Sequence, residues 1–68
     1  MENIQLAQRI RAFRKLKGLT QQQLAERIGV SLAVLGAIER GNRKADDVIL
    51  TKIAESLGVA VQELKERR

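Results

Sequence analysis

The chain contains no cysteine, histidine, proline, tryptophan or tyrosine, and Phe13 is its single aromatic residue. Without cysteine it forms no disulfide and no thiolate metal site. Without histidine it lacks the commonest metal ligand and the commonest general base. Its carboxylates stand singly or at predicted helix starts. We therefore expect no catalytic residue, no metal, no cofactor and no small-molecule substrate, and we do not expect an enzyme.

Long apolar runs are also missing, since no stretch approaches the roughly 18 residues that a membrane span requires. The chain begins acidic and polar, and no apolar run of the kind found in signal peptides follows. We expect a cytoplasmic protein without a membrane partner. With 68 residues, the chain has the size of one domain near the lower limit for folding without cross-links.

The charge is unevenly distributed, with a formal net charge of +5. The first 17 residues carry five basic side chains against one acid, Glu2; the basic ones are Arg9, Arg11, Arg14, Lys15 and Lys17. A small basic domain is typical of proteins that bind an anionic partner such as nucleic acid. A net charge of this size can also serve solubility alone, so the charge does not distinguish a nucleic-acid-binding role from a role in solubility.

The spacing of apolar residues predicts five helices and an all-α fold, because no segment of useful length alternates with a period of two. The expected helices span residues 4–17, 21–28, 32–40, 47–57 and 60–66 of a single domain covering residues 1–68. Thr20 and Gln23 have the form of a capping box, and Ser31 and either Asp46 or Asp47 are N-cap candidates. Four of the five glycines fall where helix C-terminal caps belong.

Apolar residues predict the inner face of each helix. The expected inner residues are Leu6, Ile10, Phe13 and Leu16 or Lys17 in the first helix, Leu24, Ala25 and Ile28 in the second, Leu50, Ile53, Ala54 and Leu57 in the fourth, and Val61 and Leu64 in the last. The segment 42–45 has the pattern of a polar loop.

The second and third helices are separated by a turn of three residues, Gly29-Val30-Ser31. Gly29 supplies the positive φ that a tight turn between helices requires. Ala25 allows a close approach of the partner helix, and Val30 and Ile38 can fill the angle between the two. This pattern indicates a helix-turn-helix, the unit that places its second helix in the major groove of DNA.

The residues around this turn resemble a known family, the lambda-repressor-like (Cro/C1 or Xre) helix-turn-helix domains. The resemblance is carried by Arg9-Ile10-Arg11, Arg14, Gly18-Leu19-Thr20-Gln21, Leu24-Ala25, Gly29-Val30-Ser31, Ile38-Glu39-Arg40-Gly41, Leu50, Ile53-Ala54, Leu57-Gly58-Val59 and Leu64. It covers essentially the whole chain. It implies a compact five-helix domain that serves as the DNA-binding domain of a transcriptional regulator, with double-stranded DNA as its partner and a homodimer as its form.

The resemblance also implies roles for single residues. Arg14 and Glu39 match the positions of an ion pair that links the first and third helices; a solvated Arg14 is the alternative. Gln21 matches a position whose side chain and backbone N–H meet a DNA phosphate, although a residue in the first turn of a helix needs no such role. Phosphate contact is also implied for the residues that follow the third helix, which are otherwise ordinary solvated loop residues: Arg40, Asn42, Arg43 and Lys44.

The third helix departs from the family pattern at the positions that face the groove, which here are Leu32, Ala33, Gly36 and Ala37. None of these side chains donates or accepts a hydrogen bond, and each bidentate base contact is worth about 1–3 kcal/mol of discrimination. Gly36 within a helix costs about 1 kcal/mol relative to alanine. We expect a smooth apolar surface here, extended by Val34 and by Val48 or Ile49.

Such a surface supports a second hypothesis, a protein-interaction or homodimerising module on the same scaffold, either natural or engineered. A further departure lies before the fourth helix, where Ala45 replaces a proline that is common in the family and Asp46-Asp47 follow. Two carboxylates oppose DNA, but they also suit the N-terminus of a helix.

Overall fold

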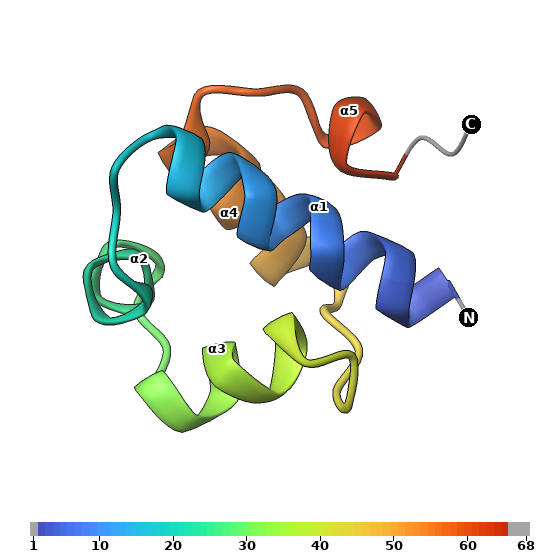
Figure 1. The fold of residues 1–68 in the computed structure, drawn as a ribbon, viewed down its shortest axis with the longest axis horizontal. Helices are drawn as coiled ribbons and strands as arrows, with labels where there is room; N and C mark the ends of the chain where they lie inside the picture. The colour runs from blue at the N-terminus through green and yellow to red at the C-terminus, as the bar shows by residue number, and fades with distance from the viewer. Residues whose placement is uncertain (1, 66–68) are drawn as a thin grey trace.

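The computed structural model describes residues 2–65, which form five helices and no strand (Figure 1). The helices are α1 (Glu2–Leu16), α2 (Gln21–Ile28), α3 (Leu32–Glu39), α4 (Asp47–Leu57) and α5 (Val61–Lys65). The protein is therefore all-helical, as the sequence predicted. None of the described helices is long and apolar enough to cross a membrane.

The ends of α2 and α4 are the predicted ones, and those of the other helices differ by one or two residues. The first helix begins at Glu2 and ends at Leu16, and α3 ends at Glu39 with Arg40 as its C-cap. The last helix begins at Val61, and residue 66 of the predicted range lies outside the described residues.

The predicted caps are present. Thr20 Oγ1 accepts the backbone N–H of Gln23 at 3.0 Å, and Gln23 Oε1 accepts the N–H of Thr20 at 2.8 Å, which confirms the capping box. Ser31 and Asp46 each accept a hydrogen bond from the backbone N–H three residues later, at 3.1 and 2.9 Å. Asp46, rather than Asp47, is therefore the cap of α4.

The helices enclose one aliphatic core. Helix α1 packs against α3, α4 and α5, while α2 packs against α3 and α4. In Figure 1, α5 and α3 lie on opposite sides of α1. The core consists of Ile10, Leu24, Ala25, Ile28, Leu35, Ile38, Ala45, Leu50, Ile53, Ala54, Leu57 and Leu64. The predicted inner residues of α2 and α4 are all among them.

Two predictions about burial were wrong. Leu16 is 77% exposed, because six helical residues turn it about 120° away from Ile10. Lys17, the alternative inner residue, is exposed as well. The buried face of α1 instead carries Ala7, Ile10 and Arg14. Ala45, predicted in a polar loop, is 6% exposed and belongs to the core.

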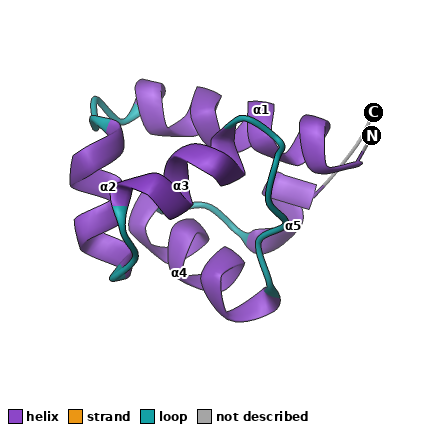
Figure 2. Ribbon diagram, turned by 90° about the horizontal axis from the view of Figure 1, so that it is seen from below, coloured by secondary structure: helices purple, strands orange, loops and turns teal. Residues whose placement is uncertain are grey.

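The turn between α2 and α3 has the predicted geometry. Gly29 adopts a left-handed conformation with φ +76° and caps α2. The N–H of Val30 bonds to the carbonyl of Ala25 at 3.1 Å, so the chain reverses at once and enters α3. The turn holds α3 against α2, and in Figure 2 α3 lies in front, between α1 and α4.

The core predicts a large difference between two leucine truncations. Leu24 is fully buried, so Leu24→Ala should destabilise the fold by about 2–5 kcal/mol. A core of this size supplies about 3–5 kcal/mol in total, so this variant should unfold at a much lower urea concentration than the unmodified chain, or without urea. The matched control, Leu16→Ala, should change the free energy of unfolding by less than about 0.5 kcal/mol. Urea titration followed by circular dichroism measures both, and similar midpoints would contradict the observed core.

Candidate nucleic-acid interface

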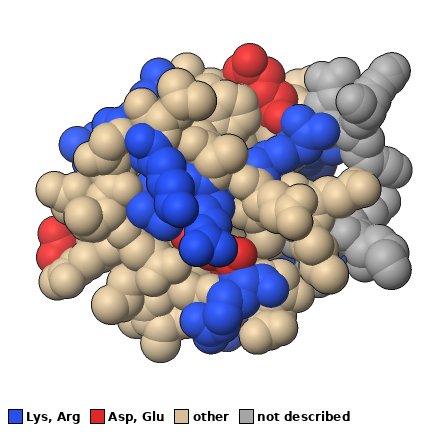
Figure 3. Space-filling view, in the orientation of Figure 1, with Lys and Arg blue, Asp and Glu red and all other residues tan. Residues whose placement is uncertain are grey.

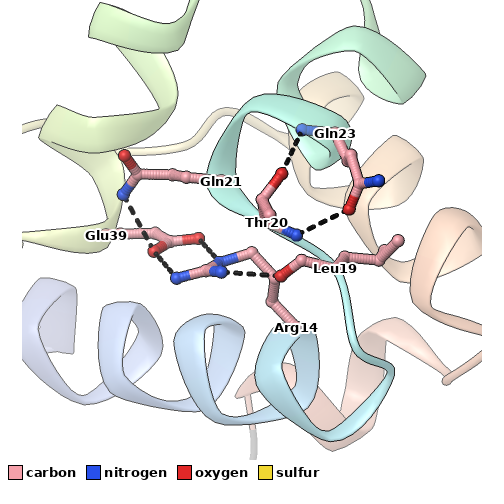
Figure 4. A network of polar contacts seen from close by, with 6 residues as sticks. All are labelled: Arg14, Leu19, Thr20, Gln21, Gln23 and Glu39. Atoms are coloured by element: carbon pink, nitrogen blue, oxygen red, sulfur yellow. Dashed lines mark hydrogen bonds and ion pairs between the residues drawn. The ribbon is translucent and has the colours of Figure 1, made fainter.

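A buried ion pair joins α1 to the end of α3. Arg14 Nε lies 2.8 Å from Glu39 Oε2, and Arg14 Nη2 donates to Glu39 Oε1 at 3.1 Å. The remaining guanidinium nitrogen, Nη1, donates to the carbonyl oxygen of Leu19 at 2.8 Å (Figure 4). Arg14 is only 8% exposed, so the solvated alternative for this residue is wrong. The guanidinium also fixes the segment that leads into α2.

Gln21, the first residue of α2, extends this network. Its Nε2 donates to Glu39 Oε1 at 3.1 Å, so the same carboxylate holds α1, α2 and α3 together. Figure 4 shows the amide oxygen of Gln21 turned away from Glu39. No pattern in the sequence predicts this bond, because Gln21 and Glu39 are 18 positions apart and share no motif spacing.

The N-terminus of α2 has the features of an anion site. The first backbone N–H groups of a helix have no intrahelical acceptor, and Thr20 takes only the N–H of Gln23. The N–H groups of Gln21 and Gln22 point out of the helix at its positive end. Phosphate groups bind at such helix ends.

The outer face of α3 carries the four residues predicted to face the groove. Leu32 is 46% exposed, Ala33 is exposed and Ala37 is half-buried. Gly36 is buried, which differs from the expected smooth surface. An ideal Cβ built on Gly36 would lie 3.1 Å from Arg40 Nη1 and 3.6 Å from Gln21 Oε1. Polar atoms of two side chains therefore cover the middle of this face.

The expected extension of the apolar surface is also interrupted. Val34 and Ile49 are partly buried and pack against the core, whereas Val48 is 64% exposed on α4. The large exposed apolar residue on α3 is thus Leu32, with the exposed Ala33 beside it.

The segment after α3 is exposed and basic. Arg40, Asn42, Arg43 and Lys44 are all exposed, and the N–H of Asn42 bonds to the carbonyl of Ala37 at 2.9 Å. This bond holds the segment next to α3. In Figure 3, Lys and Arg side chains form a band near the middle of the visible face, over α1 and towards α3. The cap of α4 explains Asp46 without a role in binding.

Two helices joined at a three-residue turn, the second with an exposed outer face beside a basic segment, define a helix-turn-helix protein. Residues 10–64 match the model of one family, HTH_3, described as helix-turn-helix. The chain belongs to this HTH_3 family.

Curated and solved relatives agree with this assignment. The HTH-type transcriptional regulator YazB of Bacillus subtilis is 50% identical over 56 residues, which are 82% of this chain and 81% of YazB. The restriction-modification controller protein C.AhdI from Aeromonas hydrophila superposes with a TM-score of 0.88 at 35% identity, over 91% of this chain and 94% of that one. SinR, a master regulator for biofilm formation solved in complex with DNA, gives 0.85 at 35% identity, over 90% and 98%.

The buried pair predicts a strong asymmetry between two arginines of α1. Arg14→Met leaves the carboxylate of Glu39 buried without its partner and should cost about 3–5 kcal/mol. Arg11→Met, at an exposed position of the same helix, should cost less than about 0.5 kcal/mol. Adding Glu39→Leu to Arg14→Met should recover part of the loss, since no buried charge then remains. Thermal unfolding of these variants and of Glu39→Leu alone completes the cycle, and a double variant whose loss equals the sum of the two single losses would contradict the pairing.

Proposed function

We propose that residues 1–68 act as one DNA-binding domain of a transcriptional regulator, with a binding role and no catalytic one. The observation that carries the proposal is the tight turn at Gly29, which fixes α3 with its outer face exposed and a basic segment at its end. In proteins of this kind the second helix lies in the major groove and the first crosses the backbone. The similarity to SinR, solved with DNA, supports the same role.

Phosphate contacts supply most of the affinity in this proposal. The N-terminus of α2 meets one phosphate through the backbone N–H of Gln21, because the side chain of Gln21 is already bonded to Glu39. The exposed side chains of Asn42, Arg43 and Lys44 meet phosphates on the other side of α3. Arg40 differs from these three, since its guanidinium lies against Gly36 on α3 itself.

The outer face of α3 contributes apolar contacts. Leu32, Ala33 and Ala37 have no hydrogen-bonding groups, so they contact the methyl groups of thymine. The domain pairs on DNA as a homodimer, since such domains bind two half-sites about one helical turn apart.

A protein-interaction module is the second candidate, because Leu32 is 46% exposed on a face of small residues. In that case α3 forms the centre of a homodimer interface and is not available to DNA. Leu32 therefore contacts DNA in the first candidate and a second copy of the chain in the other.

DNA binding should depend steeply on salt. Fluorescence anisotropy with pooled duplexes should show binding at low salt that weakens as salt rises, because each phosphate contact releases counterions. Lys44→Gln should weaken binding to all sequences alike and reduce the slope of log K against log salt by about 1 for each protomer bound. The matched control is Lys52→Gln on α4, which lines a depression at the C-terminal end of α2 and should leave the slope unchanged. Absence of binding at low salt would overturn the proposal.

Leu32→Glu separates the two candidates. A carboxylate on the groove-facing side of α3 repels DNA, so this variant should bind duplexes at least about tenfold more weakly. Its mass in solution, measured by light scattering over a range of concentrations, should equal that of the unmodified chain. A dimer that becomes a monomer through this substitution would instead favour the interaction module.

A further inference from the structure

Gly36 occupies an unusual place on α3. With 100° between successive residues, it lies in the middle of the outward-facing arc that runs from Leu32 to Ala37. Leu32 and Ala33 on this arc are exposed, yet Gly36 is buried. Its backbone φ is not in the left-handed region, unlike that of the glycines at the helix ends, so no turn or cap requires glycine here.

The side chain of Arg40 explains the burial. Arg40 follows Gly36 by one helical turn, and side chains on a helix point back towards its N-terminus. The guanidinium therefore lies over Gly36, and Nη1 is 3.1 Å from the position that a Cβ would take. This distance is tighter than nine in ten real Cβ contacts. A larger residue at position 36 would displace the guanidinium towards the end of the helix.

Gln21 brings an acceptor to the same place. Its amide nitrogen is held by Glu39, and Arg14 holds Glu39 in turn, so the orientation of the carboxamide is fixed from inside the protein. The amide oxygen faces Gly36, at 3.6 Å from the ideal Cβ position. Two polar groups thus lie beside Gly36 on a face whose own side chains are apolar.

We propose that Gly36 is a positioning residue that lets Arg40 lie along the groove-facing side of α3, where its guanidinium reads a guanine base. This inference rests on the proposed DNA-binding function and names the group that α3 recognises. Arginine binds the O6 and N7 atoms of guanine with two hydrogen bonds, the commonest specific contact in the major groove. A guanidinium has five donors, and two of them serve the base.

The position of Arg40 changes the role implied by the family resemblance. A phosphate contact requires the side chain to extend away from α3 towards the backbone of the DNA, as expected for Arg43 and Lys44. The guanidinium of Arg40 is instead drawn back by one turn, towards the part of a recognition helix that meets the bases. It supplies the hydrogen bonds that Leu32, Ala33 and Ala37 cannot make.

The test begins with duplexes selected from a random pool by the unmodified full chain. We expect a guanine at one fixed position of each selected half-site. Arg40→Ala should weaken binding to the selected duplex about 5- to 150-fold for each half-site, the range for loss of one bidentate base contact. Binding to unselected DNA should fall much less. Arg43→Ala is the matched control and should weaken both kinds of duplex equally.

A modified base identifies the contact atom. Replacing the fixed guanine by 7-deazaguanine removes N7, so it should weaken binding by the unmodified chain and leave binding by Arg40→Ala unchanged. An equal loss on selected and unselected DNA, together with a salt slope reduced by about 1 for each half-site, would assign Arg40 to a phosphate and overturn the proposal.

Gly36→Leu tests the positioning role. Leucine is a good helix former, so the variant should melt at the same or a higher temperature than the unmodified chain. It should nevertheless lose the guanine preference, and Gly36→Ala should lose less of it. In the Arg40→Ala background, Gly36→Leu should have little further effect. A loss of the same size in both backgrounds would show that Gly36 does not act through Arg40.

If the chain does not bind DNA at all, the result differs from each of those above, because the unmodified chain would then select no duplex even at low salt. That result overturns both proposals. Arg40→Ala carries the test by itself if Gly36→Leu does not fold, since an exposed side chain at the end of α3 is not part of the core.

Discussion

The bidentate pair between Arg14 and Glu39 is the interaction on which the remaining arrangement depends. Its carboxylate receives hydrogen bonds from α1 and from Gln21 at the start of α2, and it belongs to α3 itself. A charge removed from water is stable only when its partners stay in place. The angle between the two helices of the turn is therefore set by a polar network as well as by Ala25, Ile38 and the turn at Gly29.

Much of the fold could be predicted from the sequence, because short-range rules govern its helix ends. Thr20 and Gln23 form a capping box through contacts three residues apart, and Gly29 takes the left-handed conformation that follows from its lack of a side chain. The inner faces of α2 and α4 follow from apolar spacing alone. Where periodicity was ambiguous, at Leu16, the prediction was wrong because a polar residue, Arg14, occupies part of the buried stripe.

The polar part of the candidate site was less predictable, since it consists of contacts between residues far apart in the chain. The bond from Gln21 to Glu39 has no spacing signature, and the cover over Gly36 depends on the direction that the side chain of Arg40 takes. Composition described the groove-facing positions of α3 as apolar, which holds for Leu32, Ala33 and Ala37. It missed the guanidinium that reaches this face from the next turn.

The small side chains on the outer face of α3 also determine how closely the helix backbone can approach the floor of a major groove. A helix with its side chains is about 10–12 Å across, and a major groove is about 12 Å wide and 8.5 Å deep. At Ala33 and Ala37 the helix is thinner, so its backbone can sit deeper in a groove than one carrying long side chains. A helix that sits deep in the groove binds best where the groove is wide enough or the duplex flexible enough to admit it. Binding then depends on the sequence of base steps that no side chain touches.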